Sequence, residues 1–358
     1  MATFKFNNAG AWKIINRYAN YLTNQDSYIF SADYIAYGST ASPYIQAYAF
    51  NASSGYGSKF SNPAAALGFY GQDVKFSTNK DFLVVADYSS PYVDAWKWSS
   101  SGFGTKYTNP ATLPTGIGYG VSINDFNNAI AIAHSTSPYI SAYTFNYTNG
   151  FGTKYSNPVS LPTGAGHTIK LTSSYVFVGT DTTPFITAYP FDYTNGFGTK
   201  YSDPATISSY TTDSIDYNSY NNTVVYGGIG TLFVYPWSSS GFGTKYTNPY
   251  AYHYGYGVKF NRKGTLLFIA DYNSPYTYVY PWLSGFGTKY ADPASLSVGS
   301  PVYRNAGTIT DIGDAVAMVT ATSPYVQGYP FSKTTGFGTK YSNPATAFPA
   351  PYSGIAFG

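Results

Sequence analysis

The chain of 358 residues contains no cysteine, so disulfide bonds and thiolate metal sites are excluded. It also contains no glutamate, and its acidic residues are all aspartates. A glutamate pair of the glycosidase type is therefore ruled out, although aspartate pairs remain. A chain without this strong helix former, and rich in Tyr, Thr, Phe and Gly, favours strands and turns over helices.

Charge is scarce as well, because only 10% of the residues are charged and the net charge is +3. No basic run occurs, so a nucleic-acid partner is not indicated. No segment approaches the roughly 18 apolar residues of a membrane helix, so we expect no membrane insertion. The N-terminus has neither an apolar core nor a small-residue cleavage site, and we do not interpret it as a secretory signal.

What the chain has instead is a nine-residue motif that returns seven times. Successive copies begin 44 to 51 residues apart, a period that fits either a four-stranded propeller blade or a pair of helices. Frequent Gly, Pro, Asn and Ser exclude the helices. The copies are GYGSKFSNP (55–63), GFGTKYTNP (102–110), GFGTKYSNP (150–158), GFGTKYSDP (196–204), GFGTKYTNP (241–249), GFGTKYADP (285–293) and GFGTKYSNP (336–344).

Each repeat predicts four short strands. In one unit they are GYGVKF (255–260), the apolar run TLLFIAD (265–271), YTYVYPW (276–282) and a fourth strand that begins with TKY (288–290). The glycines of SGFG (284–287) are expected to form the turn between the third and fourth strands. The same order of strands and turns recurs in the other units, for example with DFLVVAD (81–87) as a second strand and YVDAWKW (92–98) as a third.

This order of strands and turns resembles the WD40-like family of β-propellers, and the uniform motif is similar to propeller repeats of uncharacterised bacteriophage proteins. The resemblance covers about residues 27–358. It implies an all-β chain with a single seven-bladed propeller of four-stranded antiparallel blades. Residues 1–26 are then an extension, either a cap on the propeller or an anchor to a larger assembly.

Two segments compete for the innermost strand of the first blade. YSGIAFG (352–358) matches the first-strand pattern GYGVKFN (255–261), and DSYIFS (26–31) aligns with HTIKLT (167–172). The C-terminal segment is favoured because it would close the ring.

The motif lysines have two interpretations. They form a positive belt for an acidic partner, or they protect exposed strand edges from pairing with other chains, and the second is favoured. The seven residues are Lys59, Lys106, Lys154, Lys200, Lys245, Lys289 and Lys340.

An aromatic residue follows Ser-Pro or Thr-Pro in six of the seven turns between the second and third strands. These residues would lie on one face as a candidate ligand-binding ring, since aromatic rings suit sugars. Packing at the start of the third strand is the alternative, and it is favoured. The six are Tyr44, Tyr92, Tyr139, Phe185, Tyr276 and Tyr325.

No metal, cofactor or catalytic site is predicted. Asp87, His134 and Asp271 end second strands, but equivalent places in different blades lie around a ring and are not expected to converge. His167 and His253 show no ligand-like spacing, and GIGYG (116–120) runs into a strand and not into a helix. We find no nucleophile elbow.

The resemblance and these absences together predict a non-enzymatic bacteriophage protein that displays its propeller on the virion for adhesion or receptor contact. Its expected partners are other virion proteins, met through the N-terminal segment, and a host-surface glycan. It would be made in the host cytoplasm and located in the virion. A cellular lectin-like or protein-interaction propeller is the alternative, and an enzyme with an unrecognised site ranks last.

Overall fold

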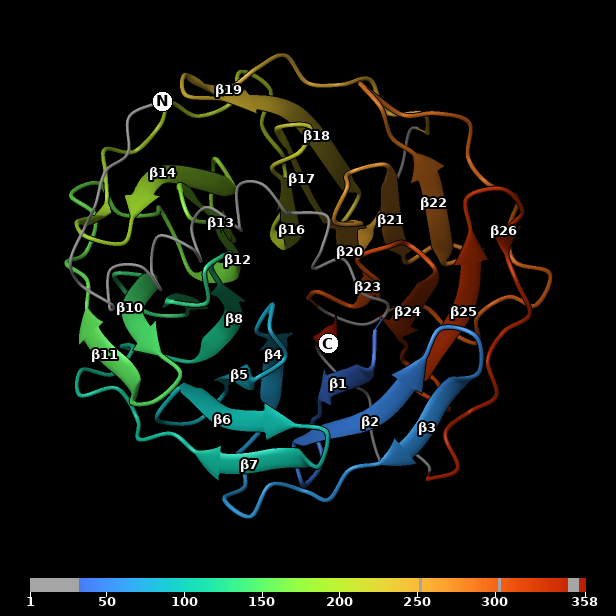
Figure 1. Cartoon of the computed structure of the whole chain (residues 1–358). Coiled ribbons are helices and arrows are strands. Elements are labelled where there is room, and N and C mark those ends of the chain that lie inside the picture. The colour runs from blue at the N-terminus through green and yellow to red at the C-terminus, as the bar shows by residue number, and fades with distance from the viewer. Residues whose placement is uncertain (1–31, 251–252, 302–303, 347–353) are drawn as a thin grey trace, which may run out of the picture.

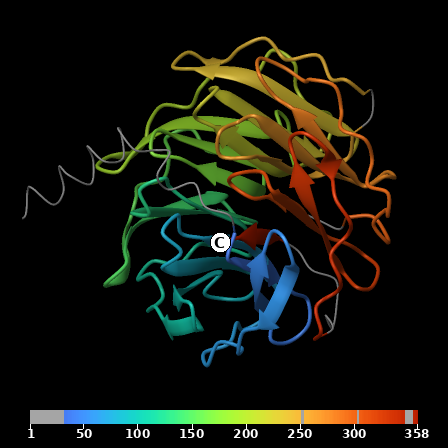
Figure 2. The ribbon, with the colours of Figure 1, turned by 45° about the vertical axis from the view of Figure 1, so that its right-hand side comes forward.

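The computed structural model describes residues 32–250, 253–301, 304–346 and 354–358. These residues form seven small antiparallel sheets arranged in a ring (Figure 1). The predicted all-β, seven-bladed propeller is confirmed. In the view of Figure 2 the sheets lie around a central axis, and the C-terminus lies beside strand β1. The described part of the chain offers no helix with the length and apolar character that a membrane crossing requires.

Each blade begins with an innermost strand at the axis, and six of the seven end with a short strand at the rim. The innermost strands are β27 (Ile355–Phe357), β4 (Gly71–Phe76), β8 (Gly118–Ile123), β12 (Gly166–Leu171), β16 (Thr212–Asn218), β20 (Gly255–Phe260) and β23 (Gly307–Ile309). The second strands are β1 (Tyr34–Gly38), β5 (Phe82–Asp87), β9 (Ala129–His134), β13 (Tyr175–Thr180), β17 (Thr223–Gly228), β21 (Leu266–Asp271) and β24 (Ala315–Val319).

The outer half of each blade completes this order, and blade one is the sheet that contains β1. The third strands are β2 (Ile45–Asn51), β6 (Val93–Ser99), β10 (Ile140–Asn146), β14 (Ile186–Asp192), β18 (Thr231–Ser238), β22 (Thr277–Pro281) and β25 (Val326–Ser332). The rim strands are β3 (Gly55–Lys59), β7 (Gly102–Lys106), β11 (Gly150–Lys154), β15 (Gly196–Phe197), β19 (Gly241–Phe242) and β26 (Gly336–Phe337).

The ring is closed by the C-terminal strand, as the sequence favoured. Strand β27 pairs antiparallel with β1, with Ala36 opposite Ala356 and Tyr37 opposite Ile355. Blade one therefore joins the two ends of the chain. The competing segment 26–31 and the extension 1–26 lie outside the described residues.

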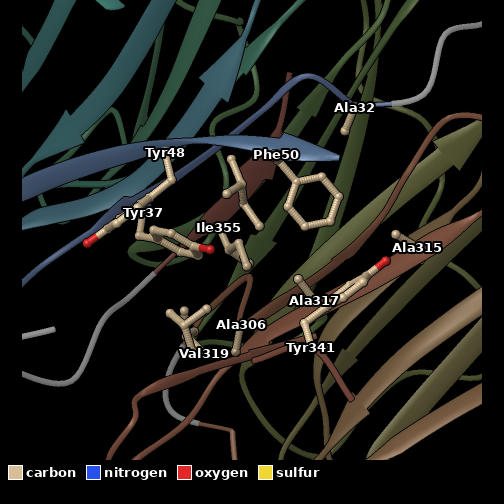
Figure 3. Close-up of a cluster of buried hydrophobic side chains, with 12 residues drawn as sticks. Ala32, Tyr37, Tyr48, Phe50, Ala306, Ala315, Ala317, Val319, Tyr341 and Ile355 are labelled. Atoms are coloured by element: carbon tan, nitrogen blue, oxygen red, sulfur yellow. The ribbon is translucent and has the colours of Figure 1, made fainter. Parts of the chain in front are cut away.

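The core is divided into seven apolar clusters, one for each interface between neighbouring blades of the described chain. The second strands supply much of it, and every residue of β5, β9 and β21 is buried. Figure 3 shows the cluster between blades seven and one, where Ile355 lies among Tyr37, Tyr48 and Val319. Burial at this seam is what makes closure favourable.

The rim strand departs from the prediction in two ways. The turn between the third and fourth strands precedes the motif, so that the first glycine already pairs, as Gly55 does with Asn51. The strand spans five residues in blades one to three but only two in blades four, five and seven. In blade six the predicted strand at 288–290 is absent, and an isolated bridge joins Trp282 to Phe286.

The repeated motif links each blade to the next. The tyrosine of one copy packs against the first glycine of the following copy, where a Cβ at Gly150 would lie 2.7 Å from the Tyr107 ring. The Tyr107 hydroxyl then donates a 2.7 Å hydrogen bond to the carbonyl of Tyr147. Seven equivalent contacts form a belt around the rim, made of Phe60–Gly102, Tyr107–Gly150, Tyr155–Gly196, Tyr201–Gly241, Tyr246–Gly285, Tyr290–Gly336 and Tyr341–Gly55.

The motif lysines mostly bond within their own blade. Lys59 Nζ lies 3.0 Å from Asn62 Oδ1, and Lys200 Nζ lies 2.6 Å from Asp203 Oδ1. Lys154 and Lys289 make the same contact with the Asn or Asp three residues later. The other three motif lysines bond elsewhere, as Lys106 does with Asp94 on the third strand of its blade. Their role as an acidic-surface belt or as edge protection stays a prediction.

Candidate functional site

The turns between the second and third strands open on the same face as the starts of the innermost strands, and we call this the SP face. In six blades the aromatic residue after the proline has a positive φ of 64° to 69°. Its carbonyl accepts a hydrogen bond from the last residue of the second strand, as Tyr92 does from Asp87. The turn of blade one also lies against the innermost strand of blade two. A Cβ placed on Gly71, the first residue of β4, would lie 2.5 Å from the Tyr44 carbonyl oxygen.

The six aromatic side chains are all half-buried. Tyr44 packs against the apolar cluster between blades one and two, with its ring 5.6 Å from that of Phe69. Tyr276 and Tyr325 pack against the clusters on either side of blade seven. These contacts agree with the packing interpretation, while a sugar-binding ring stays a prediction. In blade five the turn is reduced to Ile229 and Gly230.

The polar residues that end the second strands bond within their own blades, and Asp271 Oδ2 also lies 2.7 Å from His253 Nδ1. Asp87 Oδ1 accepts a hydrogen bond from the Ser89 amide at 2.9 Å, and Asp271 Oδ1 accepts one from Asn273 at 2.8 Å. His134 Nε2 lies 3.1 Å from Ser141 Oγ, and burial lowers the pKa of His134 to about 4. Over residues 32–250, 253–301, 304–346 and 354–358, no three His or Asp side chains are arranged to hold a metal ion.

Burial raises the pKa of Asp87 to about 6, with a smaller contribution from Asp94. Because the pKa of Asp87 is higher in the folded chain than in the unfolded chain, ionising this residue destabilises the fold. Its effect on the free energy of unfolding is most favourable below about pH 4 and becomes less favourable as the pH rises through 6. We expect Asp87→Asn to stabilise the fold at pH 8 by up to about 3 kcal/mol, and to have little effect at pH 4. Urea unfolding at the two pH values measures this.

Asp192→Asn is the matched control, since it removes the same charge at the exposed rim. Asn51 and Asn146 already occupy the equivalent place in other blades and accept the same backbone hydrogen bonds. It should change stability little at either pH. Equal effects of the two substitutions would contradict the assignment to buried charge.

A second group of side chains gathers where the central channel opens on the SP face. In five blades the pairing of the first and second strands shifts after the first residue of the innermost strand, so that the second residue is bulged out of the ladder. Bulges of this kind redirect a side chain and are enriched near active sites. The bulged residues are Gln72, Tyr119, His167, Asp213 and Tyr256.

Three of these residues surround Arg304, which leads into β23 of blade seven. The Arg304 guanidinium carbon lies 4.1 Å from the centre of the Tyr119 ring, and its Nη2 lies 3.4 Å from His167 Nε2. Asp213 Oδ1 lies 3.5 Å from His167 Nδ1 and 3.9 Å from Arg304 Nε. Asp181, from the SP turn of blade four, completes the group at 4.0 Å from His167 Nε2.

We call Tyr119, His167, Asp181, Asp213 and Arg304 the mouth cluster. Burial lowers the pKa of Arg304, while the nearby Asp213 carboxylate opposes that shift. His167 Nδ1 and Arg304 Nε are both buried and have no hydrogen-bond partner. Unpaired buried donors are uncommon in folded proteins and are found at sites that bind or react.

The geometry defines the part that each group can take. His167 lies between Asp213, whose Oδ1 is 3.5 Å from Nδ1, and Arg304, whose Nη2 is 3.4 Å from Nε2. An imidazole oriented in this way by a carboxylate is suited to take a proton from water. The distance of 3.5 Å between His167 and Asp213 is long, as is common in sites without substrate.

The sequence did not indicate the mouth cluster. Its members lie up to 185 residues apart in the numbering, from Tyr119 to Arg304, and meet only because the ring brings their blades to one opening. One feature of the sequence points to the cluster. The second residue of the innermost strand differs from blade to blade, although most other positions of the repeat are similar in all blades. A repeated position with varied polar side chains indicates a role that blade geometry does not require.

No family model matches the chain, and no curated protein matches it. The fold is similar to solved propellers at 13% identity or less. One is a "putative 6-phosphogluconolactonase" from Bacteroides uniformis, with a TM-score of 0.66, 13% identity and coverage of 92% of this chain and 100% of that one. Another is the periplasmic gluconolactonase of Pseudomonas aeruginosa, with a TM-score of 0.64, 11% identity and coverage of 90% and 98%.

A WD40 relationship is supported at the level of fold alone. The Swd1 β-propeller domain of Myceliophteria thermophila has a TM-score of 0.56 and 11% identity, and the match covers 77% of this chain and 88% of that one. None of the three structures named here is a bacteriophage protein.

These similarities correct two predictions from the sequence. The expectation of a non-enzymatic bacteriophage virion protein is wrong, since propellers with lactonase names match nearly the whole chain. The expectation that the chain is not an enzyme is wrong for the same reason. Motifs close in sequence do not reveal groups of side chains from different blades, such as the mouth cluster, whose residues come from blades three, four, five and seven.

Proposed function

We propose that the chain is a hydrolase that opens a small lactone at the mouth cluster. The observation that carries the proposal is the convergence of His167, Asp213 and Arg304 at the opening of the channel. The lactonase names of similar propellers support the substrate class.

The chemistry follows from the order of the groups. Arg304 Nη2 leaves His167 Nε2 for the lactone carbonyl oxygen, and Nε2 takes a proton from water as the water oxygen bonds to the lactone carbonyl carbon. The Arg304 guanidinium stabilises the negative charge that develops on the carbonyl oxygen, where a preorganised cation is most effective. The ring C–O bond then breaks, and the proton held by His167 passes to the leaving alkoxide. The product is an open hydroxy acid, and His167 returns to its starting state.

The test is hydrolysis of a gluconolactone and of its 6-phosphate, followed in a pH-stat at pH 6.5 where the uncatalysed reaction is slow. We expect His167→Gln to lower kcat/KM by about 100-fold or more, the usual contribution of a general base. Arg304→Met should lower kcat by a similar factor. Asp213→Asn, a change in a positioning residue, should lower kcat with little change in KM.

Gln72→Ala is the control, because it alters the equivalent bulge in blade two, a blade that supplies no residue of the mouth cluster. It should keep full activity. Turnover by His167→Gln at the parent rate would contradict the assignment of the base, and absence of lactone turnover by the parent chain would contradict the substrate class.

A further inference from the structure

The described chain has a cavity near the axis, at the ends of the innermost strands opposite the mouth cluster. Its volume is about 270 Å³, and it is lined by the innermost strands of all seven blades and by the turns that follow them. Figure 1 shows these strands around the axis. We call this cavity the chamber. Among its lining residues are Lys75, Lys170, Asp216 and Lys259.

These four side chains come from one repeated place, the fifth residue of an innermost strand. Because the blades are equivalent, this place forms a ring around the chamber. Cations occupy it in blades two, four and six, and the only carboxylate at this place in the described chain is that of Asp216 in blade five. In order from blade one, the ring is Ala356, Lys75, Ser122, Lys170, Asp216, Lys259 and Thr308.

The carboxylates near the ring do not balance its ammonium groups. Asp216 Oδ1 alone faces both Lys170 Nζ at 2.9 Å and Lys259 Nζ at 3.2 Å. Lys75 Nζ lies 2.5 Å from Asp73, whose other oxygen accepts hydrogen bonds from the Val121 amide and the Asn305 side chain. Three cations thus share two carboxylates, and one positive charge is left over.

Of the other charged groups of the lining, Lys80 and Arg262 are paired with carboxylates, whereas Asp125 bonds to Ser173. Lys80 bonds Asp33 at 2.7 Å, and the Arg262 guanidinium lies 3.5 Å from Asp311. Asp125 accepts a hydrogen bond from the Ser173 amide. The local excess therefore lies with the three lysines of the ring, and the Asp125 carboxylate offsets it across the chamber by acting on Lys170 from beyond contact distance.

The lysines are crowded enough to affect one another. Burial lowers the pKa of Lys259, and the ammonium groups of Lys170 and Lys75 add to the effect while Asp216 opposes it. Their side chains remain 22% to 34% exposed, so the ammonium groups reach the chamber. An anion placed among them would relieve this repulsion in a partly dehydrated space, where charge–charge attraction is strong.

We propose that the chamber binds a phosphate group through Lys75, Lys170 and Lys259. Three ammonium groups that line one cavity supply several donors for the oxygens and the double charge of phosphate. The cavity is larger than inorganic phosphate needs, so a phosphate monoester of a small molecule fits the same donors. This site is separate from the mouth cluster and does not depend on the proposed lactonase activity.

The test is isothermal titration calorimetry of the full chain with inorganic phosphate and with glycerol phosphate at pH 7 and low salt. We expect saturable binding that weakens as sodium chloride is raised, because charge attraction is screened. Lys259→Met should weaken binding by about tenfold, and Lys75→Met combined with Lys259→Met should abolish it. Tighter binding of glycerol phosphate than of phosphate would identify a monoester as the ligand.

Lys200→Met is the matched control, since it removes a lysine that is paired with Asp203 at the rim. It should bind phosphate as the parent does. A second variant tests the sign of the charge argument: Asp216→Asn keeps an acceptor for the Phe260 amide but adds one net positive charge, and should tighten binding. Circular dichroism melts without phosphate establish that each variant is folded.

Three results would overturn the proposal: no phosphate heat beyond that of chloride at matched ionic strength, unchanged affinity in the Lys75 and Lys259 double variant, or equal loss in Lys200→Met. Failure of the lactonase proposal would look different. Lys259→Met should leave lactone turnover unchanged, and His167→Gln should leave phosphate affinity unchanged.

Discussion

A chain that ends at residue 353 is expected to melt about 10 °C below the full chain. The truncation removes β27, the innermost strand of blade one, and leaves β1 with an unpaired inner edge. It also removes five backbone hydrogen bonds: the Gly358 carbonyl accepts from Asp33 and Tyr34 and its amide donates to Tyr34, while Gly354 accepts from Gly38 and donates to Arg304.

The size of the effect follows from burial. Ile355 and Ala356 are nearly fully buried, and Ile355 belongs to the cluster between blades seven and one. Their transfer to water, together with the lost hydrogen bonds, amounts to about 6 kcal/mol. A chain of this size loses roughly 2 °C of melting temperature for each kcal/mol.

Differential scanning calorimetry of the truncated chain measures the shift, and a synthetic peptide of residues 350–358 provides the control. Added in excess, the peptide should restore much of the melting temperature by refilling the open edge of β1. An unchanged melt would show that another segment takes the place of β27, and residues 26–31 are the candidate that the sequence offers.

Much of the fold could be predicted because the same physical problem recurs in every blade. The second strands are buried on both faces, so they appear as continuous apolar runs, and the predicted 265–271 corresponds to β21. Turn residues fixed the length of the unit. Strand β20 was predicted at its observed bounds, 255–260.

The rim and the site were harder for different reasons. The rim strand is held by contacts with the next blade, as in the packing of Tyr107 on Gly150, and such contacts are not visible within one repeat. The mouth cluster depends on where a bulge points and on which blades face one another across the channel. Tertiary geometry sets both, and the local pattern around His167 or Arg304 contains neither.

The repeat therefore divides into two kinds of positions. Where each blade needs the same contact, as in the belt, the residues are nearly identical. Where the blades meet at the axis, they differ: the bulged place holds Gln72, Tyr119, His167, Asp213 and Tyr256. The ring of the chamber varies in the same way, from Lys170 to Asp216. Both proposed sites lie at the varied positions.

The packing of a rim tyrosine on the first glycine of the next motif copy is expected to contribute strongly to the stability of the fold. Gly150 has a φ of +83°, and a Cβ placed on it would lie 2.7 Å from the Tyr107 ring. We expect Gly150→Ala to destabilise the fold by about 3 kcal/mol, of which about 1–2 kcal/mol comes from the left-handed backbone and the rest from displacing the ring. Urea unfolding of the parent and the variant measures the loss.

Gly230→Ala separates the two contributions, because Gly230 has a φ of +63° but no atom within 4 Å of its Cβ position. It should cost only the backbone part, about 1–2 kcal/mol. Tyr107→Leu then tests the contact itself, since a smaller side chain leaves room for the methyl group. Gly150→Ala should cost less in that background, with a coupling energy of about 1 kcal/mol. Equal losses of stability for Gly150→Ala and Gly230→Ala, both unchanged in the Tyr107→Leu background, would contradict this prediction. The rim tyrosines would then not hold neighbouring blades together, and the near-identity of the motif copies would have another cause.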